Sequence, residues 1–241
     1  MMTFRSSGGS TGGGGGIAQD GANLVLFDDF LAVTNSGSVP DGAFRWLTAN
    51  SGSGANINTN AATLDANTFG MAAMTTGTTT TGIAAIYSGP AQIRFGGGSY
   101  TLAIRFQFPS LLDGTESGSI YLGFGDNAGG AFVDGAYLYW DNSQTNFRYR
   151  TRNNNTQTDV DSGLAPAAGT WYKLEITVNA AGTNVNFKIN GANSQDITTN
   201  IPTAAGRETG VLCQIIKSAG TTARQIYLDY VRLALAMTSR T

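Results

Sequence analysis

Apolar and polar residues alternate along this chain from residue 99 onward, and this pattern constrains the fold more than any other feature. The segments 100–108, 119–124 and 170–178 place apolar side chains at every second position. Because successive side chains of a β-strand point to opposite faces, this period is typical of strands with one face in a core. Turn residues separate the segments, and no stretch shows the period of an amphipathic helix. The pattern predicts roughly ten or more short strands packed as a β-sandwich or jelly roll.

Charge and the rarer residue types exclude several functions. Charged residues make up 12% of the chain and the net charge is −2, so we expect neither nucleic acid nor a membrane surface as a partner. The chain has no histidine, which rules out histidine-based triads and histidine-ligated zinc. The single cysteine, Cys213, lies in an apolar segment, which predicts a buried, unreactive thiol. The first 30 residues lack the apolar run of a signal peptide, and no stretch approaches the length of a membrane span.

Composition divides the chain into two parts. Residues 1–23 contain a glycine tract, Gly12 to Gly16, and almost nothing to bury. Such a segment is either a disordered tail or an arm that docks on a partner or on another copy of the chain. Residues 24–241 are predicted to form the sandwich domain.

A hairpin in the C-terminal half resembles a known class of sandwich. The segments 169–176, Gly-Thr-Trp-Tyr-Lys-Leu-Glu-Ile, and 182–191 resemble a hairpin of concanavalin A-like (laminin G-like) domains. The opening Phe27-Asp28-Asp29-Phe30 and the closing segment 226–233 are similar to the first and last strands of that class, which lie close together. The resemblance covers residues 24–235 and implies an all-β, antiparallel jelly-roll sandwich. It implies no single activity, because this fold hosts lectins, hydrolases, lyases and structural modules.

The composition and organisation of the whole chain resemble those of virion proteins of tailed bacteriophages. The glycine-rich arm, the Thr/Asn/Ala-rich strands, the low charge and the missing signal peptide carry this resemblance. It implies a structural protein on the virion surface, of the capsid-decoration or tail-fibre type, anchored through its N-terminal arm. Its partners would be other virion proteins and copies of itself, as a trimer by analogy with phage fibres. The alternative is a carbohydrate-binding module or lectin that recognises a host surface glycan and could depend on calcium. A polysaccharide lyase is a third class.

The sequence lacks the catalytic motifs of enzymes in the resembled class. Glycosidases of the resembled class carry two or more carboxylates on one strand, spaced Glu-x-Asp-x-(x)-Glu, because hydrolysis needs a carboxylate pair that flanks the bond. Glu116, Glu175 and Glu208 are the glutamates of this chain, and none has an acidic residue two positions away. Lyases of the class use combinations such as histidine, tyrosine, glutamine and arginine. Histidine is missing here, although the three arginines of the segment 148–152 with Tyr137 or Tyr139 could in principle bind a uronic acid and abstract a proton. We therefore expect the chain not to be an enzyme.

Two groups of residues are candidates for binding. Tyr137 and Tyr139 alternate with Leu138 and Trp140, so one pair must point away from the core, where aromatic rings could contact a glycan or another subunit. In the following segment three arginines share one face, which is either a solvated face, an interface or an anion site. The predicted ligand-binding residues are Tyr137, Tyr139, Trp140, Arg148, Arg150 and Arg152. Asp126, Asp134 and Asp141 are candidate calcium ligands, although turn formation explains them equally well. No other cofactor is expected.

Overall fold

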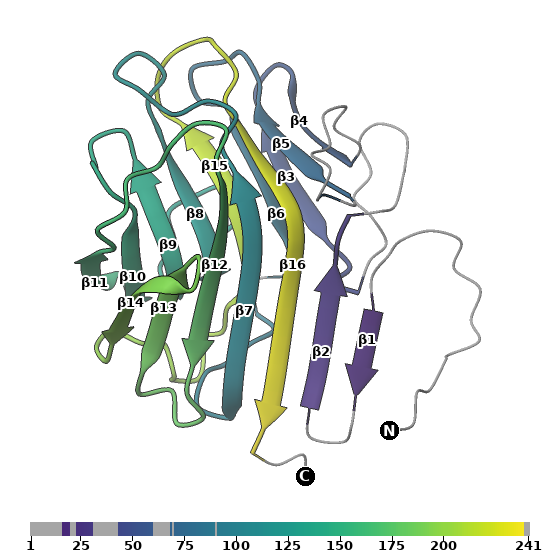
Figure 1. Ribbon diagram of the computed structural model, residues 1–241, viewed down its shortest axis with the longest axis vertical. Coiled ribbons are helices and arrows are strands. Elements are labelled where there is room, and N and C mark those ends of the chain that lie inside the picture. The colour runs from purple at the N-terminus through teal and green to yellow at the C-terminus, as the bar shows by residue number, and fades with distance from the viewer. Residues whose placement is uncertain are drawn as a thin grey trace, which may run out of the picture.

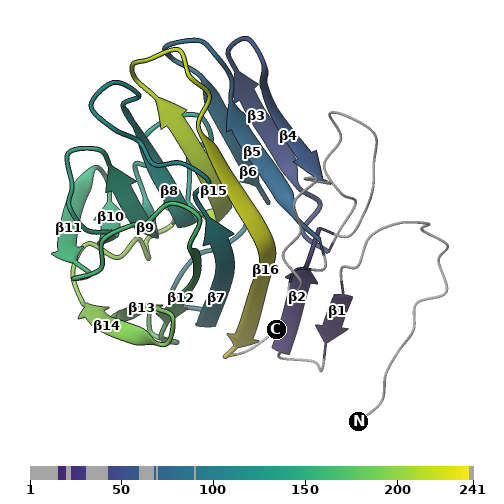
Figure 2. The same ribbon diagram turned by 45° about the horizontal axis from the view of Figure 1, so that its top comes forward.

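The computed structural model describes residues 16–19, 23–30, 43–59, 68, 70–89 and 91–238, and within these ranges the chain forms sixteen strands and no helix. The strands make two antiparallel sheets that face each other (Figures 1 and 2). The all-β antiparallel sandwich predicted from the alternation is confirmed. The described residues also contain no helix long and apolar enough to cross a membrane.

The larger sheet has nine strands and the smaller has seven. The nine-stranded sheet runs in the order β1 (Gly16–Gln19), β2 (Asn23–Asp28), β16 (Gln225–Met237), β7 (Gly98–Gln107), β12 (Trp171–Val178), β13 (Val185–Ile189) and β14 (Ala192–Ile197), with β5 (Ala72–Thr76) pairing β16 and β4 (Ala55–Thr59) pairing β5. The seven-stranded sheet runs in the order β11 (Thr156–Asp161), β10 (Arg148–Asn153), β9 (Gly135–Asp141), β8 (Gly118–Gly125), β15 (Gly210–Lys217), β6 (Ile83–Tyr87) and β3 (Leu47–Ser51).

The ends of the domain meet in the nine-stranded sheet. β2 and β16 are neighbours, with Phe27 opposite Arg232, as the concanavalin A-like resemblance implied. β1 pairs with β2 from Gly16 opposite Phe27 to Gln19 opposite Leu24. The sheet therefore extends into the segment predicted to be an arm. The remainder of that segment, residues 1–15 and 20–22, lies outside the described residues.

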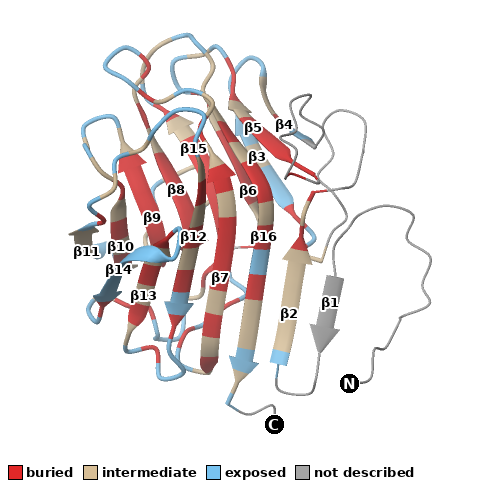
Figure 3. Ribbon diagram, viewed as in Figure 1, coloured by how far each residue is buried: buried red, intermediate tan, exposed pale blue. Residues whose placement is uncertain are grey.

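The core lies between the sheets and follows the alternation (Figure 3). On β12 every second residue, Tyr172, Leu174, Ile176 and Val178, is buried. Phe106 on β7 is completely buried and has three aromatic neighbours, with ring centroids 5.3 Å away for Phe108, 6.0 Å for Phe147 and 5.5 Å for Tyr172. Burial of this apolar area, at roughly 25 cal/mol per Å², is the main force that holds the two sheets together.

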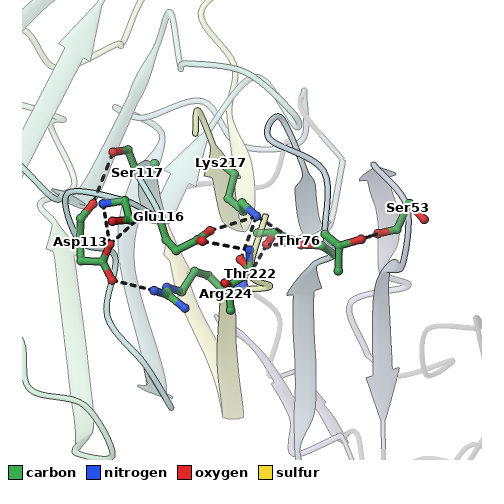
Figure 4. A network of polar contacts seen from close by, with 12 residues as sticks. Ser53, Thr76, Asp113, Glu116, Ser117, Lys217, Thr222 and Arg224 are labelled. Carbon is green, nitrogen blue, oxygen red and sulfur yellow. Dashed lines mark hydrogen bonds and ion pairs between the residues drawn. The ribbon is translucent and has the colours of Figure 1, made fainter. Parts of the chain in front are cut away.

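A buried ion pair joins two loops at one end of the sandwich (Figure 4). The side chain of Lys217, the last residue of β15, is completely buried, and its Nζ lies 3.4 Å from Glu116 Oε2. The same Nζ donates to the carbonyl of Thr222 at 2.8 Å, and Glu116 Oε1 accepts the N–H of Thr222 at 3.0 Å. Beside this ion pair, Arg224 donates to Asp113 at 2.7 Å. These contacts hold the loop between β15 and β16 against the loop that precedes β8.

Cys213 is completely buried on the core side of β15, as predicted from its apolar neighbours. Burial raises the pKa of its thiol, because a thiolate loses its solvation there. We expect the folded protein not to react with a thiol reagent at neutral pH, whereas the denatured chain reacts with one equivalent. Absorbance of the released chromophore measures this, and rapid labelling of the folded protein would contradict it.

Candidate functional site

The strongest candidate site lies on the outer face of the seven-stranded sheet, the side turned away from the core. Strand pairing decides which side chains meet there: Tyr139 lies opposite Tyr121 on β8 and opposite Arg148 on β10, and Tyr137 lies opposite Arg150. Leu138 and Trp140 point into the core instead. Tyr137 and Tyr139 are therefore the pair outside the core, on the side of the predicted arginines, but both are buried there in a second cluster, with 0% and 7% of their surface exposed.

Aromatic rings form a second apolar cluster on this face. We call Tyr121, Phe132, Tyr137, Tyr139 and Leu212 the outer aromatic cluster. The ring of Tyr121 lies 5.0 Å from Phe132 and 5.1 Å from Tyr139, and Phe132 lies 4.7 Å from Tyr137. Trp140, although predicted as a ligand-binding residue, stacks on Phe108 at 6.1 Å inside the core. It is not part of this site, because it follows Tyr139 on the same strand and so faces the opposite way.

Two arginines of β10 are joined by one carboxylate of the edge strand β11. Asp159 accepts the Nε–H of Arg148 at 2.5 Å and the Nε–H of Arg150 at 2.6 Å. Asp161 accepts a second bond from Arg148 at 2.9 Å. The third arginine, Arg152, donates to the side-chain amide of Asn155 at 3.2 Å. Two of the three arginines that the sequence showed as a row of cations, Arg148 and Arg150, are therefore held in ion pairs, whereas Arg152 bonds a neutral side chain.

The arginines connect to the aromatic cluster through a stack. The guanidinium carbon of Arg150 lies 3.6 Å from the centroid of the Tyr139 ring, a cation–π distance. The Tyr139 hydroxyl donates to Asp141 at 2.5 Å. Burial, together with this bond to Asp141, raises the pKa of Tyr139 to about 12, so the phenol stays protonated at neutral pH. We call the connected residues Asp161, Arg148, Asp159, Arg150, Tyr139 and Asp141 the polar band.

A loop between β8 and β9 covers part of this face. Gln214 of β15 is buried beneath it and makes two bonds with its backbone, to Gly129 N–H at 2.8 Å and Gly130 carbonyl at 2.7 Å. Phe132 of the same loop fits against Gly125, where an added Cβ would lie 2.2 Å from the ring. The loop covers one end of the outer aromatic cluster and leaves the polar band at the side of β10 and β11.

The structure does not bring the three predicted calcium ligands together. Asp126 accepts the N–H of Val133 at 2.9 Å, which closes the loop. Asp134 accepts the N–H of Asn154 at 2.7 Å and pairs with Arg207 at 3.1 Å. Asp141 lies at the opposite end of β9 from Asp134. Within the described ranges no three acidic or cysteine side chains gather in a way that could hold a metal ion.

The sequence alone did not single out Asp159 and Asp161 as partners of the arginines. The spacing of these residues was a usable signal: Asp159 and Asp161 are two residues apart, as Arg148 and Arg150 are, so each pair occupies one face of its strand. The sequence could not show that β11 pairs with β10 in the register that sets Asp159 opposite Arg150.

The family of the chain follows from its match to a family model. The model described as "SO2946-like, C-terminal domain" matches residues 67–229, which is more than half of the chain. The chain belongs to the SO2946-like C-terminal domain family. The SO2946-like chain is similar to the crystal structure of SO2946, a protein of unknown function from Shewanella oneidensis MR-1. The TM-score is 0.69 at 16% identity, over 92% of this chain and 90% of that one.

Two further solved structures place the SO2946-like fold among known sandwiches. An endo-1,3-β-glucanase from Streptomyces sioyaensis matches with a TM-score of 0.60 at 12% identity, over 91% of this chain and 99% of that one. The carbohydrate recognition domain of Emp47p matches with a TM-score of 0.53 at 12% identity, over 90% and 96%. These likenesses show the fold alone, and they confirm the concanavalin A-like sandwich. No curated protein sequence matches the chain.

The prediction that the chain is not an enzyme is contradicted by these matches, because the structures that share its fold include a glucanase. The missing motif and the missing histidine exclude particular catalytic arrangements, and extending that exclusion to every enzymatic activity was wrong. Phage-particle association, a virion surface location and trimer formation stay predictions.

Proposed function

We propose that the chain binds carbohydrate on the outer face of the seven-stranded sheet, across the polar band. The observation that carries the proposal is the Arg150–Tyr139 stack, held at 3.6 Å and joined through Asp159 to Arg148. Planar guanidinium groups with several N–H donors, set beside carboxylates that accept, match the paired hydroxyl groups of a sugar ring.

The part of the polar band that Arg148, Arg150 and Asp159 form can be reached from solvent while its geometry stays fixed, whereas Tyr139, on which Arg150 stacks, is buried. The side chains of Arg148, Arg150 and Asp159 are 22%, 14% and 21% exposed, so each offers part of its polar surface. Their mutual bonds restrict rotation, and a binding site that is already ordered loses less entropy when a ligand docks. The matches to a carbohydrate recognition domain and to a glucanase support the same ligand class.

The decisive experiment compares two arginine-to-lysine variants on an array of glycans. In Arg150→Lys the charge is kept while the planar group that stacks on Tyr139 is lost. Arg105→Lys is the matched control, because Arg105 also stacks on an aromatic ring, 4.6 Å from Trp171, and also pairs with a carboxylate, Asp229, but in the other sheet. We expect Arg150→Lys to weaken glycan binding about tenfold, the loss of one charge-assisted contact, and Arg105→Lys to bind as the wild type does.

The proposal fails if the wild-type chain binds no glycan, or if both variants weaken binding equally. Incubating each bound glycan with the chain and separating the products measures cleavage at the same time, which tests whether binding leads to a reaction. Repeating the array with a chelator tests calcium dependence. The separation of Asp134 from Asp141 along β9 leads us to expect no effect of the chelator.

A further inference from the structure

We infer that this face selects neutral glycans over acidic ones, and that Asp159 determines that selectivity. The inference rests on the proposed function and adds to it the substrate class and the residue that sets it. It reverses what the row of three arginines suggested, because such a row on its own would attract the carboxylates of an acidic polysaccharide.

The charges of Arg148 and Arg150 are balanced by two carboxylates of β11. Asp159 binds both Arg148 and Arg150, and Asp161 gives Arg148 a second carboxylate. Arg152, at the far end of β10 from Arg148, donates to the neutral side chain of Asn155 instead. Where β10 and β11 meet, two guanidinium groups and two carboxylates thus share one surface, and their summed charge is zero.

A carboxylate on a ligand would therefore meet repulsion at the place where it should bind. The Nε–H groups of Arg148 and Arg150, which a ligand carboxylate would use, both point to Asp159 at 2.5 and 2.6 Å. A ligand anion would have to displace Asp159 or lie beside it, and like charges at that separation repel strongly away from bulk water. A sugar hydroxyl avoids this cost, since it accepts from the remaining guanidinium N–H groups and donates to the carboxylates.

Asp159 has more control over this balance than the other carboxylates of the band. It touches both arginines, and its side chain is 21% exposed against 48% for Asp161. Asp161 touches only Arg148 among the arginines, and its greater contact with water screens its charge more. Removing the charge of Asp159 leaves the Arg150 guanidinium without its carboxylate. That guanidinium is stacked on Tyr139, and the Arg150 side chain is only 14% exposed.

The test measures binding of matched neutral and uronate-containing oligosaccharides by calorimetry, at low and at high salt. We expect the wild-type chain to bind the neutral oligosaccharide at least about tenfold more tightly. Asp159→Asn is expected to gain about tenfold for the acidic one, since one charge-assisted pair becomes available. High salt should reduce that gain, because the arginines remain partly exposed.

Asp196→Asn is the matched control, because it changes the net charge by the same amount. Asp196 is exposed on β14 of the other sheet, where Asn184 and Asn186 donate to it at 3.0 Å. This variant should leave both affinities unchanged. If Asp159→Asn does not fold, as thermal unfolding shows, Asp161→Asn replaces it and should give a smaller gain in the same direction.

Tighter binding of acidic glycans by the wild-type chain would overturn the inference and leave the proposed function standing. An equal response of Asp159→Asn and Asp196→Asn would also overturn it, because selectivity would then follow net charge rather than the polar band. If no variant binds any glycan, the proposed function itself fails, and the inference fails with it.

Discussion

Replacing Lys217 with methionine is expected to lower the free energy of unfolding by about 3–5 kcal/mol, the cost of breaking a buried ion pair at one partner. Lys217 is completely buried, and its ammonium is the cation that faces Glu116 at 3.4 Å and the carbonyl of Thr222 at 2.8 Å (Figure 4). Methionine fills a similar volume but leaves that carboxylate and carbonyl without their donor. Chemical denaturation followed by tryptophan fluorescence measures the loss.

A double-mutant cycle separates the ion pair from the packing. Lys217→Met combined with Glu116→Met removes both charges, so we expect the double variant to recover much of the loss. A double variant whose loss of stability equals the sum of the two single losses would contradict an interaction between the two side chains. Unchanged stability of Lys217→Met would show that the ammonium contributes nothing in this position.

The same network gives the folded state a dependence on acid. Burial raises the pKa of Glu116, but the bonds from Thr222 and the pairing with Lys217 outweigh it, and the pKa lies below its ordinary value of 4.5. A carboxyl with a depressed folded pKa stabilises the fold above its unfolded pKa, and that contribution is lost as the pH falls through the folded value. Stability should therefore decrease below pH 4.5, and less steeply in Glu116→Gln than in the wild type.

Phe106→Ala is expected to cost about 3–5 kcal/mol, as large-to-small changes of aromatic residues in a core do. The ring is completely buried between the sheets and packs on Phe108, Phe147 and Tyr172 with centroids between 5.3 and 6.0 Å away. Because Phe147, just before β10, and Tyr172 of β12 belong to two other segments of the chain, the neighbours cannot all move in to fill the space. Calorimetric unfolding measures the change.

Leu47→Ala is the control for Phe106→Ala. Leu47 is the large apolar side chain that is most exposed in the described part of the chain, at 49%, and its truncation should change the free energy of unfolding by no more than about 0.5 kcal/mol. A loss as small as this for Phe106→Ala would mean that the core between β7, β12 and the opposite sheet is loosely packed.

The fold could be predicted because strands with one buried face alternate apolar and polar residues in the sequence. The alternation at Tyr172, Leu174, Ile176 and Val178 is the same in the chain and in the core. The opening and closing strands, β2 and β16, also pair as the resemblance implied. The segment 16–19 was assigned to the arm because it lies next to a glycine tract, and only its pairing with β2 joins it to the sheet.

The candidate site was predictable only in part. Alternation required either Tyr139 or Trp140 to leave the core, but both are aromatic, so polarity could not decide which one. The packing decides it: Trp140 meets Phe108, which directly follows β7 of the opposite sheet, and its indole N–H donates to the Gln144 carbonyl at 2.9 Å. A tyrosine at the outer position can keep its hydroxyl bonded to Asp141.

By itself the sequence determined the class of fold, the buried face of each strand with clear alternation, and the burial of Cys213. These properties depend on periods and compositions within single segments. Only the tertiary structure decided the charge of the outer face. Arg148 and Arg150 appear as free cations in the sequence, and they are neutralised by Asp159 and Asp161 because β11 folds back beside β10 in one particular register. Electrostatic energy depends on the distance between charges in space, and that distance is set by strand pairing rather than by order along the chain.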